Sequence, residues 1–232
     1  MGVVVELCGL PGSGKSALAA HTCTALLRLG VDAVVADLPV SAAAPASARI
    51  RRKVLASALA AAAEPVATTR AGRGVARSRP APRDGLGLLA QWLTVRRLHQ
   101  SARARPGVWL LEEGLVQTVW SLMLRAPARG ADPVGLLEVR PPDLLVVVQA
   151  PLDVLLRRLD DRPSRHSRTQ RLAADRRGAE LERGLLLLDR LVDTVPGERI
   201  TVPNDGSVPI AELGRHTAER VLRAVQAGGR AS

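Results

Sequence analysis

The stretch Gly-Leu-Pro-Gly-Ser-Gly-Lys-Ser at residues 9–16 fills every position of the phosphate-loop motif G-x-x-x-x-G-K-[ST]. A short β-branched run at residues 3–7 precedes it and predicts a buried strand, while residues 16–29 predict a helix that Gly30 closes. Strand, loop and helix therefore follow one another as phosphate binding requires, because the loop amides and the positive end of the helix both point at the anion. The motif predicts that this chain binds a nucleoside triphosphate.

Each residue of this loop has an expected contribution. Lys15 is expected to reach the β- and γ-phosphates, and the Ser16 hydroxyl to ligate Mg²⁺. The other positions expected to wrap the phosphates are Gly9, Pro11, Gly12, Ser13 and Gly14. The expected cofactors are therefore ATP and Mg²⁺.

Length and composition set the class of protein. The 232 residues suffice for one α/β domain with a substantial core, and we expect a single domain over residues 1–232. No run approaches the roughly 18 to 20 apolar residues that span a bilayer, so no membrane association is expected. Cys8 and Cys23 match no zinc pattern and favour reduced thiols. With no leader-like segment before the first strand, these features predict a cytoplasmic protein.

Four further apolar runs predict strands, and helical segments separate them. The strands are expected at residues 33–36, 108–111, 144–148 and 200–202. Helices are expected at residues 41–59, 86–102, 116–124, from Pro151 onward, and at 178–193 and 209–225. Residues 64–85 carry Pro, Gly, Arg and small residues without an apolar period, which predicts a mobile loop. Five apolar strands separated by helices indicate an α/β protein of the P-loop NTPase fold, with a five-stranded, mostly parallel sheet covered on both faces.

The formal charge of +11 is concentrated in the middle of the chain. Residues 49–105 hold thirteen Arg or Lys but only two acids, Glu64 and Asp84. A GC-rich genome would explain the arginines as a compositional bias. An anion-binding insert would explain them by function, because guanidinium groups clamp phosphates with paired hydrogen bonds. Both explanations stay open.

Glu112 and Glu113 follow the expected third strand at its carboxyl end. In a parallel α/β sheet ligands bind at that edge, so we expect these carboxylates near the phosphate loop. A carboxylate there can hold Mg²⁺ or accept a proton from an attacking hydroxyl. Which of the two is catalytic stays open, and the favoured arrangement has Glu112 on the metal side and Glu113 on the acceptor side. The alternative is a surface turn with two solvated acids.

A cluster of arginines follows the expected fourth strand, between residues 157 and 168. Such a cluster can close over a triphosphate and neutralise charge that develops on the transferred phosphoryl group. The alternative is an ordinary exposed helix with charge pairs four residues apart, such as Asp153 with Arg157. The arginines alone do not decide between the two.

Taken with the phosphate loop, these features resemble the nucleoside monophosphate kinases of the P-loop kinase group, thymidylate kinases in particular. Their fourth strand reads Pro-Asp-Leu plus an apolar run, as residues 142–148 do here, and an arginine-bearing helix then leads into a lid. The likeness covers residues 1–37 and 107–225. It implies a lid at about residues 157–177 and places Asn204 in the loop on the adenine side. The lid arginines are the catalytic candidates Arg158 and Arg162 and the ATP-binding candidates Arg165 and Arg168.

The same resemblance implies an acceptor side between the second and third strands. There residues 41–105 would form a basic helical and loop insert that binds an anionic acceptor. The arginines expected to make that contact are Arg70, Arg73, Arg77 and Arg79. Asp37, at the end of the second strand, would contact or deprotonate the acceptor hydroxyl, unless it only caps the loop before Leu38.

The expected function is transfer of the γ-phosphoryl group of Mg-ATP to a small anionic or hydroxylated acceptor, first of all a nucleotide or nucleoside. A regulatory ATPase whose basic insert engages nucleic acid or an acidic partner is the second interpretation, less favoured because aromatic residues are scarce among the arginines. A GTPase is third, since no Asn-Lys-x-Asp motif occurs. Without Phe or Tyr, only Trp92, Trp109 or Trp120 could stack a base, and Trp109 is expected inside the sheet. The oligomeric state is open, a homodimer included.

Overall fold

The computed structural model describes residues 1–36, 58, 61–62, 65–77, 82–126, 141–161 and 169–229. Five strands form one sheet in the order β2-β3-β1-β4-β5, and every neighbouring pair is parallel. The strands are β1 (Val3–Cys8), β2 (Ala33–Ala36), β3 (Val108–Leu111), β4 (Leu144–Gln149) and β5 (Glu198–Pro203). The predicted α/β class and five-stranded sheet are confirmed, and the sheet is parallel throughout.

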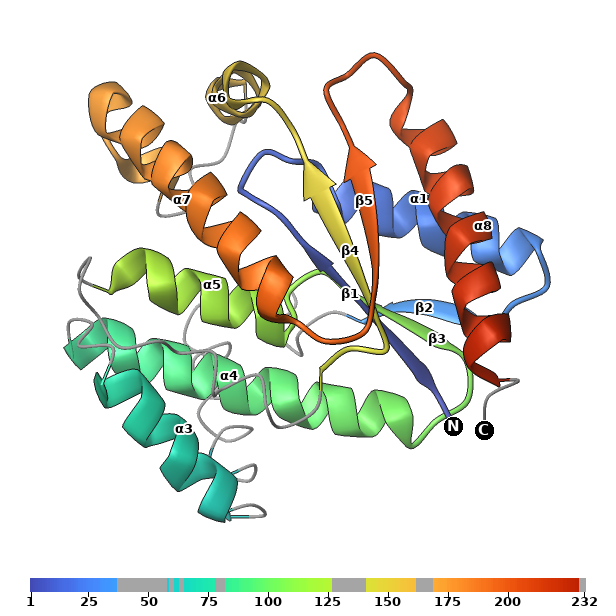
Figure 1. Cartoon of the computed structure of the whole chain (residues 1–232), viewed down its shortest axis with the longest axis horizontal. Coiled ribbons are helices and arrows are strands. Elements are labelled where there is room, and N and C mark those ends of the chain that lie inside the picture. Colours follow the sequence, from blue (N-terminus) through green and yellow to red (C-terminus); the bar gives the residue numbers. More distant parts are fainter. Residues whose placement is uncertain are drawn as a thin grey trace, which may run out of the picture.

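Helices cover both faces of this sheet (Figure 1). They are α1 (Lys15–Arg28), α3 (Pro65–Arg77), α4 (Pro82–Arg103), α5 (Leu115–Arg125), α6 (Leu152–Asp160), α7 (Ala174–Thr194) and α8 (Ile210–Gly229), with a short 3₁₀ helix η2 (Thr169–Arg171). On one face α1 packs against α8. On the other face α5 packs between α4 and α7, and α3 packs against α4. Within the described residues, none of these helices combines the length and apolar character that a membrane crossing needs.

The central strand β1 shows why both faces need cover. Val5 and Leu7 are buried in an apolar cluster with α1 and α8, whereas Val4 and Cys8 are buried on the opposite face. Successive side chains of a strand point to opposite faces, so a strand that is apolar at nearly every position must be covered twice. Glu6 interrupts this apolar run and is nevertheless fully buried.

The mobile loop expected over residues 64–85 is wrong wherever the structure describes that stretch. Residues Ala67, Ala71 and Val75 recur every four positions and pack together against the core as one face of α3. Spacing of this kind aligns side chains along a helix, but the surrounding Arg and Gly obscured it in the sequence. α4 also begins earlier than predicted, at Pro82, because proline suits the first turn of a helix.

The other predicted helices and strands are confirmed to within a few residues at each end. They include the helix after the phosphate loop and the four remaining strands of the sheet. The helix expected at residues 41–59 lies outside the described residues, apart from residue 58.

Candidate functional site

The phosphate loop joins the end of β1 to the start of α1. Gly12 and Gly14 adopt φ angles of 89° and 92°, a left-handed conformation that favours glycine. A Cβ at Gly14 would also lie 2.4 Å from Nδ2 of Asn204, so no larger residue fits there. Gly14 is the N-cap residue of α1 and offers no side-chain cap, so the amides of the first helical turn lie at the end of the loop.

Lys15 lies folded over this loop. Its Nζ donates hydrogen bonds to the carbonyl oxygens of Gly9 (2.5 Å) and Leu10 (3.2 Å). Its ammonium group is thus held beside the loop backbone, where a bound phosphate chain would lie.

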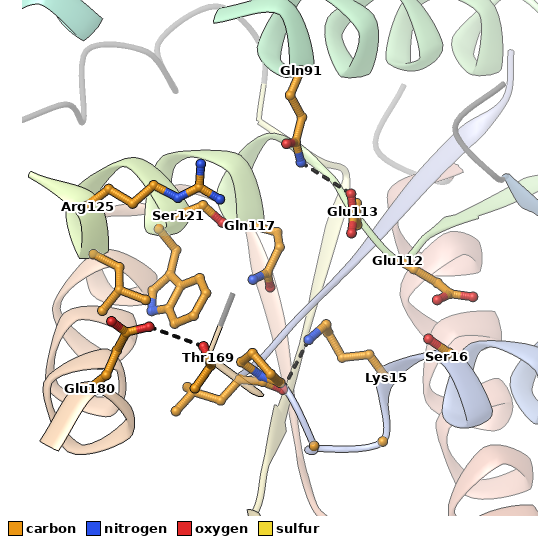
Figure 2. A pocket seen from close by; sticks show the side chains of 16 residues that line it. Lys15, Ser16, Gln91, Glu112, Glu113, Gln117, Ser121, Arg125, Thr169 and Glu180 are labelled. Carbon is orange, nitrogen blue, oxygen red and sulfur yellow. Dashed lines mark hydrogen bonds between the residues drawn. The ribbon is translucent and has the colours of Figure 1, made fainter. Parts of the chain in front are cut away.

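A cavity of about 370 Å³ opens beside the loop (Figure 2). The loop forms one side, and the turn after β3 contributes Glu112 and Glu113. The opposite wall comes from α4 and α5 and is lined by Gln91, Gln117, Trp120, Ser121, Leu124 and Arg125. Thr169 and Glu180 complete the lining. Of the predicted loop residues, Pro11, Gly12, Gly14, Lys15 and Ser16 line the cavity.

The two predicted carboxylates lie on different sides of this cavity. Figure 2 shows Glu112 extending near Ser16, while Glu113 turns toward Gln91. Nε2 of Gln91 donates a hydrogen bond to Oε2 of Glu113 (3.2 Å). Adjacent residues after a strand project in opposite directions. One carboxylate therefore faces the loop and the other faces the wall.

Glu6 is a charged residue of the site region that the sequence analysis missed. It is fully buried, and burial raises the pKa of its carboxyl from 4.5 to about 8, against the opposing effect of backbone amides at the start of α5. Its Oε2 lies 3.7 Å from Nε2 of His99, and burial lowers the pKa of that imidazole from 6.5 to about 4. The available signal was a single acid within a run of β-branched strand residues.

Gln117 connects α5 to the phosphate loop. Its Oε1 accepts a hydrogen bond from the backbone N–H of Gly9 (3.1 Å), and the side chain also lines the cavity. Gln117, Ser121 and Arg125 follow at intervals of four residues, which puts them along one face of the helix. Polar side chains spaced four residues apart in a largely apolar segment are a sequence signal that could have predicted this wall of the cavity.

Arg158 and Asn204 lie beneath the loop and do not line the cavity. The Arg158 guanidinium donates hydrogen bonds to the carbonyl oxygen of Asn204 (3.0 Å), to its Oδ1 (3.2 Å) and to the carbonyl oxygen of Gly12 (3.5 Å). Nδ2 of Asn204 donates to the carbonyl oxygen of Ser13 (2.7 Å). Both residues therefore hydrogen-bond the loop backbone from outside the cavity. A catalytic role for Arg158 and an ATP contact for Asn204 stay predictions.

The remaining predicted site residues fall into two groups, those outside the described residues and those that line a different hollow. Asp37 and the lid arginines Arg162, Arg165 and Arg168 lie outside the described residues, as does Arg79. Arg70, Arg73 and Arg77 are exposed along α3 and line a separate hollow of about 500 Å³. The structure therefore does not place these three arginines around the phosphate loop.

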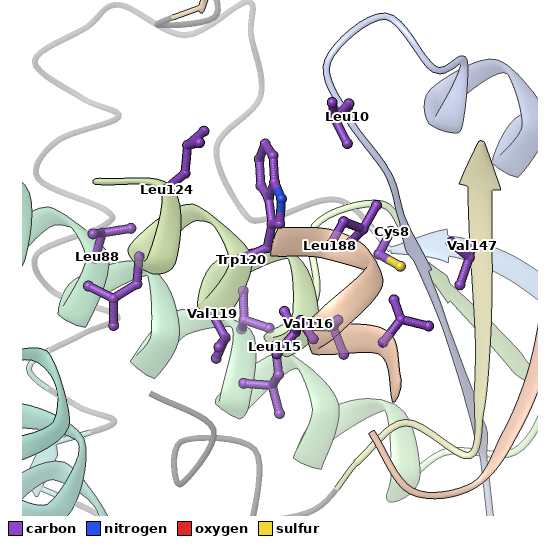
Figure 3. Packing of buried hydrophobic residues seen from close by; sticks show 14 of the residues in the cluster. Cys8, Leu10, Leu88, Leu115, Val116, Val119, Trp120, Leu124, Val147 and Leu188 are labelled. Atoms are coloured by element: carbon purple, nitrogen blue, oxygen red, sulfur yellow. The ribbon is translucent and has the colours of Figure 1, made fainter. Parts of the chain in front are cut away.

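The three tryptophans occupy different environments. Trp92 is buried in the core, and Trp109, expected inside the sheet, is only partly buried beneath the Arg105 guanidinium. Trp120 lines the cavity while belonging to the same buried cluster as Leu10 of the loop (Figure 3). Its indole N–H donates to the carbonyl oxygen of Gly184 (2.8 Å), which fixes the ring in the wall.

A comparison with models of known protein families found no match, and a comparison with curated protein sequences found none either. The functional interpretation therefore rests on the motif and on the geometry of this cavity.

Proposed function

We propose that this chain is a P-loop phosphotransferase that moves the γ-phosphoryl group of Mg-ATP to a small acceptor, first of all a nucleotide or nucleoside. The observation that carries the proposal is one cavity lined by Lys15, Ser16, Glu112 and Glu113. A phosphate loop alone would suit any nucleoside triphosphatase. Carboxylates that face a walled space beyond the loop are what transfer to an acceptor additionally requires. The parallel sheet, with the loop after its central strand, supports assignment to the P-loop NTPase fold.

The phosphate loop binds ATP in this proposal. Lys15 exchanges the carbonyl oxygens of Gly9 and Leu10 for oxygens of the β- and γ-phosphates. The amides at the start of α1 and the loop backbone would donate to the same phosphates. Asn204 hydrogen-bonds the Ser13 carbonyl of the loop, and Arg158 in turn hydrogen-bonds Asn204, so in this proposal the loop conformation is fixed before the nucleotide binds.

Ser16 and Glu112 would hold Mg²⁺. Both line the cavity, and a hydroxyl with a carboxylate offers the oxygen donors that Mg²⁺ prefers. Mg²⁺ commonly takes only one or two protein ligands beside phosphate oxygens and water, so these two residues fit it. When bound, the ion neutralises charge on the phosphate groups.

Glu113 and the wall would receive the acceptor. The hydrogen bond from Gln91 holds the Glu113 carboxylate at the wall, where it can orient an acceptor hydroxyl and take its proton. Gln117 and Ser121 offer further hydrogen-bonding groups there. Arg125 adds a cation, which lies 3.7 Å from Asp84. A small hydroxylated or anionic acceptor matches this lining.

We also propose a cytoplasmic location. Cys8 and Cys23 are both free thiols in the structure. Free thiols fit a reducing compartment better than a secreted environment, where cysteines tend to pair.

The test is to incubate the protein with Mg²⁺ and ATP labelled in its γ-phosphate, together with nucleosides, nucleoside monophosphates and small hydroxylated metabolites. Label that appears in an acceptor, and that is absent with Lys15→Ala, supports the proposal. Phosphate release that nucleic acid stimulates, with no labelled acceptor, would favour a regulatory ATPase instead.

A further inference from the structure

The carboxyl of Glu6 needs partners, because it is buried in the middle of the sheet. A carboxyl removed from water loses its hydration, and burial is tolerated only where polar groups replace that hydration. Glu6 has such a group at the start of α5, while Nε2 of His99 on α4 lies 3.7 Å from Oε2, beyond hydrogen-bond distance.

The first partner is the amino-terminal turn of α5. Gly114 is the N-cap residue of this helix and has no side chain to satisfy the free amides. Oε1 of Glu6 instead accepts from the N–H of Gln117 (3.1 Å), the third residue of the helix. This is the amide that a capping side chain ordinarily satisfies. Glu6 thus caps α5 from a different element of the fold.

The fit between this carboxyl and the turn is close. A Cβ added at Gly114 would lie 1.9 Å from Cδ of Glu6 and 2.3 Å from its Oε1. A larger residue at that position would have to displace the carboxyl, although the φ of −101° is open to any residue. Glu112 and Glu113 immediately precede Gly114, so the carboxyl contacts the very turn that carries them.

The same helical turn is tied to the phosphate loop. Gln117 donates its backbone N–H to Glu6, and its side-chain Oε1 accepts the N–H of Gly9. All these groups are buried. One short set of hydrogen bonds therefore links the carboxylate turn, the start of α5 and the first residue of the loop.

We propose that Glu6 is a positioning residue for phosphoryl transfer: by capping α5 it sets the separation between the phosphate loop and the Glu112–Glu113 turn. The inference rests on the proposed function for what that separation accomplishes. Glu6 does not line the loop cavity, so it acts through α5.

Glu6→Leu and Glu6→Gln test this inference as a pair. Leucine removes the acceptor atom, whereas glutamine keeps an oxygen that can accept the Gln117 amide. We expect Glu6→Leu to lower kcat on the order of 10²-fold, because small misplacements of reacting groups cost about that much. We expect the KM for Mg-ATP to change by less than about 3-fold, and Glu6→Gln to restore kcat to within about 5-fold of the wild type, since the contact survives.

Thr22→Val is the matched control. Thr22 is also fully buried, its hydroxyl has no hydrogen-bond partner in the described part of the chain, and it lies in α1 on the other face of the sheet. We expect it to leave kcat unchanged. Equal kcat losses in Glu6→Gln and Glu6→Leu, or no loss in either, would overturn the positioning role.

Hydrogen exchange provides a readout that does not depend on catalysis. In Glu6→Leu the amides of residues 115–117 and of Gly9 should exchange faster than in the wild type, with the strands of the sheet unaffected. If the wild type transfers no phosphoryl group while this exchange pattern is seen, the proposed function fails and the capping contact stands. Unchanged exchange at residues 115–117 would refute the contact itself.

Should Glu6→Leu fail to fold, Gly114→Ala probes the contact from the other side, because its methyl group must displace the carboxyl. We expect a loss of kcat that the additional change Glu6→Asp partly reverses by withdrawing the carboxyl. No loss in Gly114→Ala, or no recovery in the double variant, would count against the inference.

Discussion

The two faces of the sheet are built from the same strands but serve different purposes. The face under α1 and α8 is packed with aliphatic side chains, and its buried polar residues Thr22 and Thr217 carry only hydroxyl groups. The face under α4 and α5 buries a carboxyl, an imidazole and an amide, those of Glu6, His99 and Gln117. Burying ionisable groups costs stability. Both faces bury an apolar core, and we conclude that the second face, through its buried polar groups, also holds the geometry of the site.

The loop lysine should show the largest effect. Lys15→Ala removes the charge expected at the β- and γ-phosphates, so turnover should fall by on the order of 10³-fold or more and ATP binding should weaken. The melting temperature should stay the same. Arg28→Ala, an exposed change at the other end of α1, is the control for turnover and for melting. Full ATP-dependent activity in Lys15→Ala would contradict the kinase interpretation.

The two carboxylate variants should have the next largest effects, and each should change a different kinetic parameter. Glu112→Gln should raise the Mg²⁺ concentration needed for half-maximal turnover, whereas Glu113→Gln should lower kcat on the order of 10²-fold through loss of proton transfer. Steady-state assays with Mg²⁺ and acceptor varied independently distinguish the two. If both variants keep wild-type kinetics, the site has been assigned to the wrong edge of the sheet.

A change in the apolar face should affect stability alone. Leu26 is fully buried between α1 and the sheet, and Leu26→Ala should lower the free energy of unfolding by about 3 kcal/mol. Urea unfolding measures this loss, and kcat measured well below the melting temperature should not change. A fall in kcat in the folded variant would show that the two faces are not separable.

The polar face should make stability depend on pH. Folding raises the Glu6 pKa from 4.5 to about 8, so the contribution of Glu6 is full below pH 4.5 and is lost as the pH rises toward 8. Folding lowers the His99 pKa from 6.5 to about 4, so its slope is opposite between pH 4 and 6.5. The two slopes oppose each other up to pH 6.5, and above that value only the loss from Glu6 continues.

Between pH 6.5 and 8 the wild type should therefore lose up to about 1.4 kcal/mol of stability per pH unit that Glu6→Gln does not lose. Urea unfolding of both proteins across this range gives the difference. A difference that is constant with pH would mean that Glu6 ionises normally in the folded protein.

The smallest effect is expected for the basic surface of α3. Arg70, Arg73 and Arg77 line a hollow apart from the phosphate-loop cavity, so replacing all three with Ala should change kcat and both KM values by less than about 2-fold. A large rise in the acceptor KM would instead support the expectation that Arg70, Arg73 and Arg77 bind the acceptor. Loss of salt-sensitive nucleic-acid binding would give this surface a separate role.

The sequence predicted the sheet well for a physical reason. Strands buried on both faces are continuous apolar runs, and residues 144–148 are such a run, bounded by proline and a polar residue. The placement of Glu112 and Glu113 beside the loop followed from the same sheet, because the carboxyl ends of parallel strands share one edge.

The rest depended on how elements pack. Nothing local indicates that Arg158 turns under the loop, because a helix position does not say which neighbour its side chain meets. The strand pattern likewise does not show that the buried Glu6 carboxyl accepts a hydrogen bond from the backbone amide of Gln117, 111 residues away in the sequence. Helix α3 was missed because Gly, Arg and Thr separate its apolar residues, although three of these set its buried face.

A crystal structure with Mg²⁺ and a non-hydrolysable ATP analogue tests the central claim most directly. We predict that the β- and γ-phosphates contact Lys15, that the ion contacts Ser16 and lies on the Glu112 side, and that the γ-phosphate faces the wall formed by α4 and α5. A γ-phosphate that points away from this cavity, with Glu112 and Glu113 remote from it, would contradict the account.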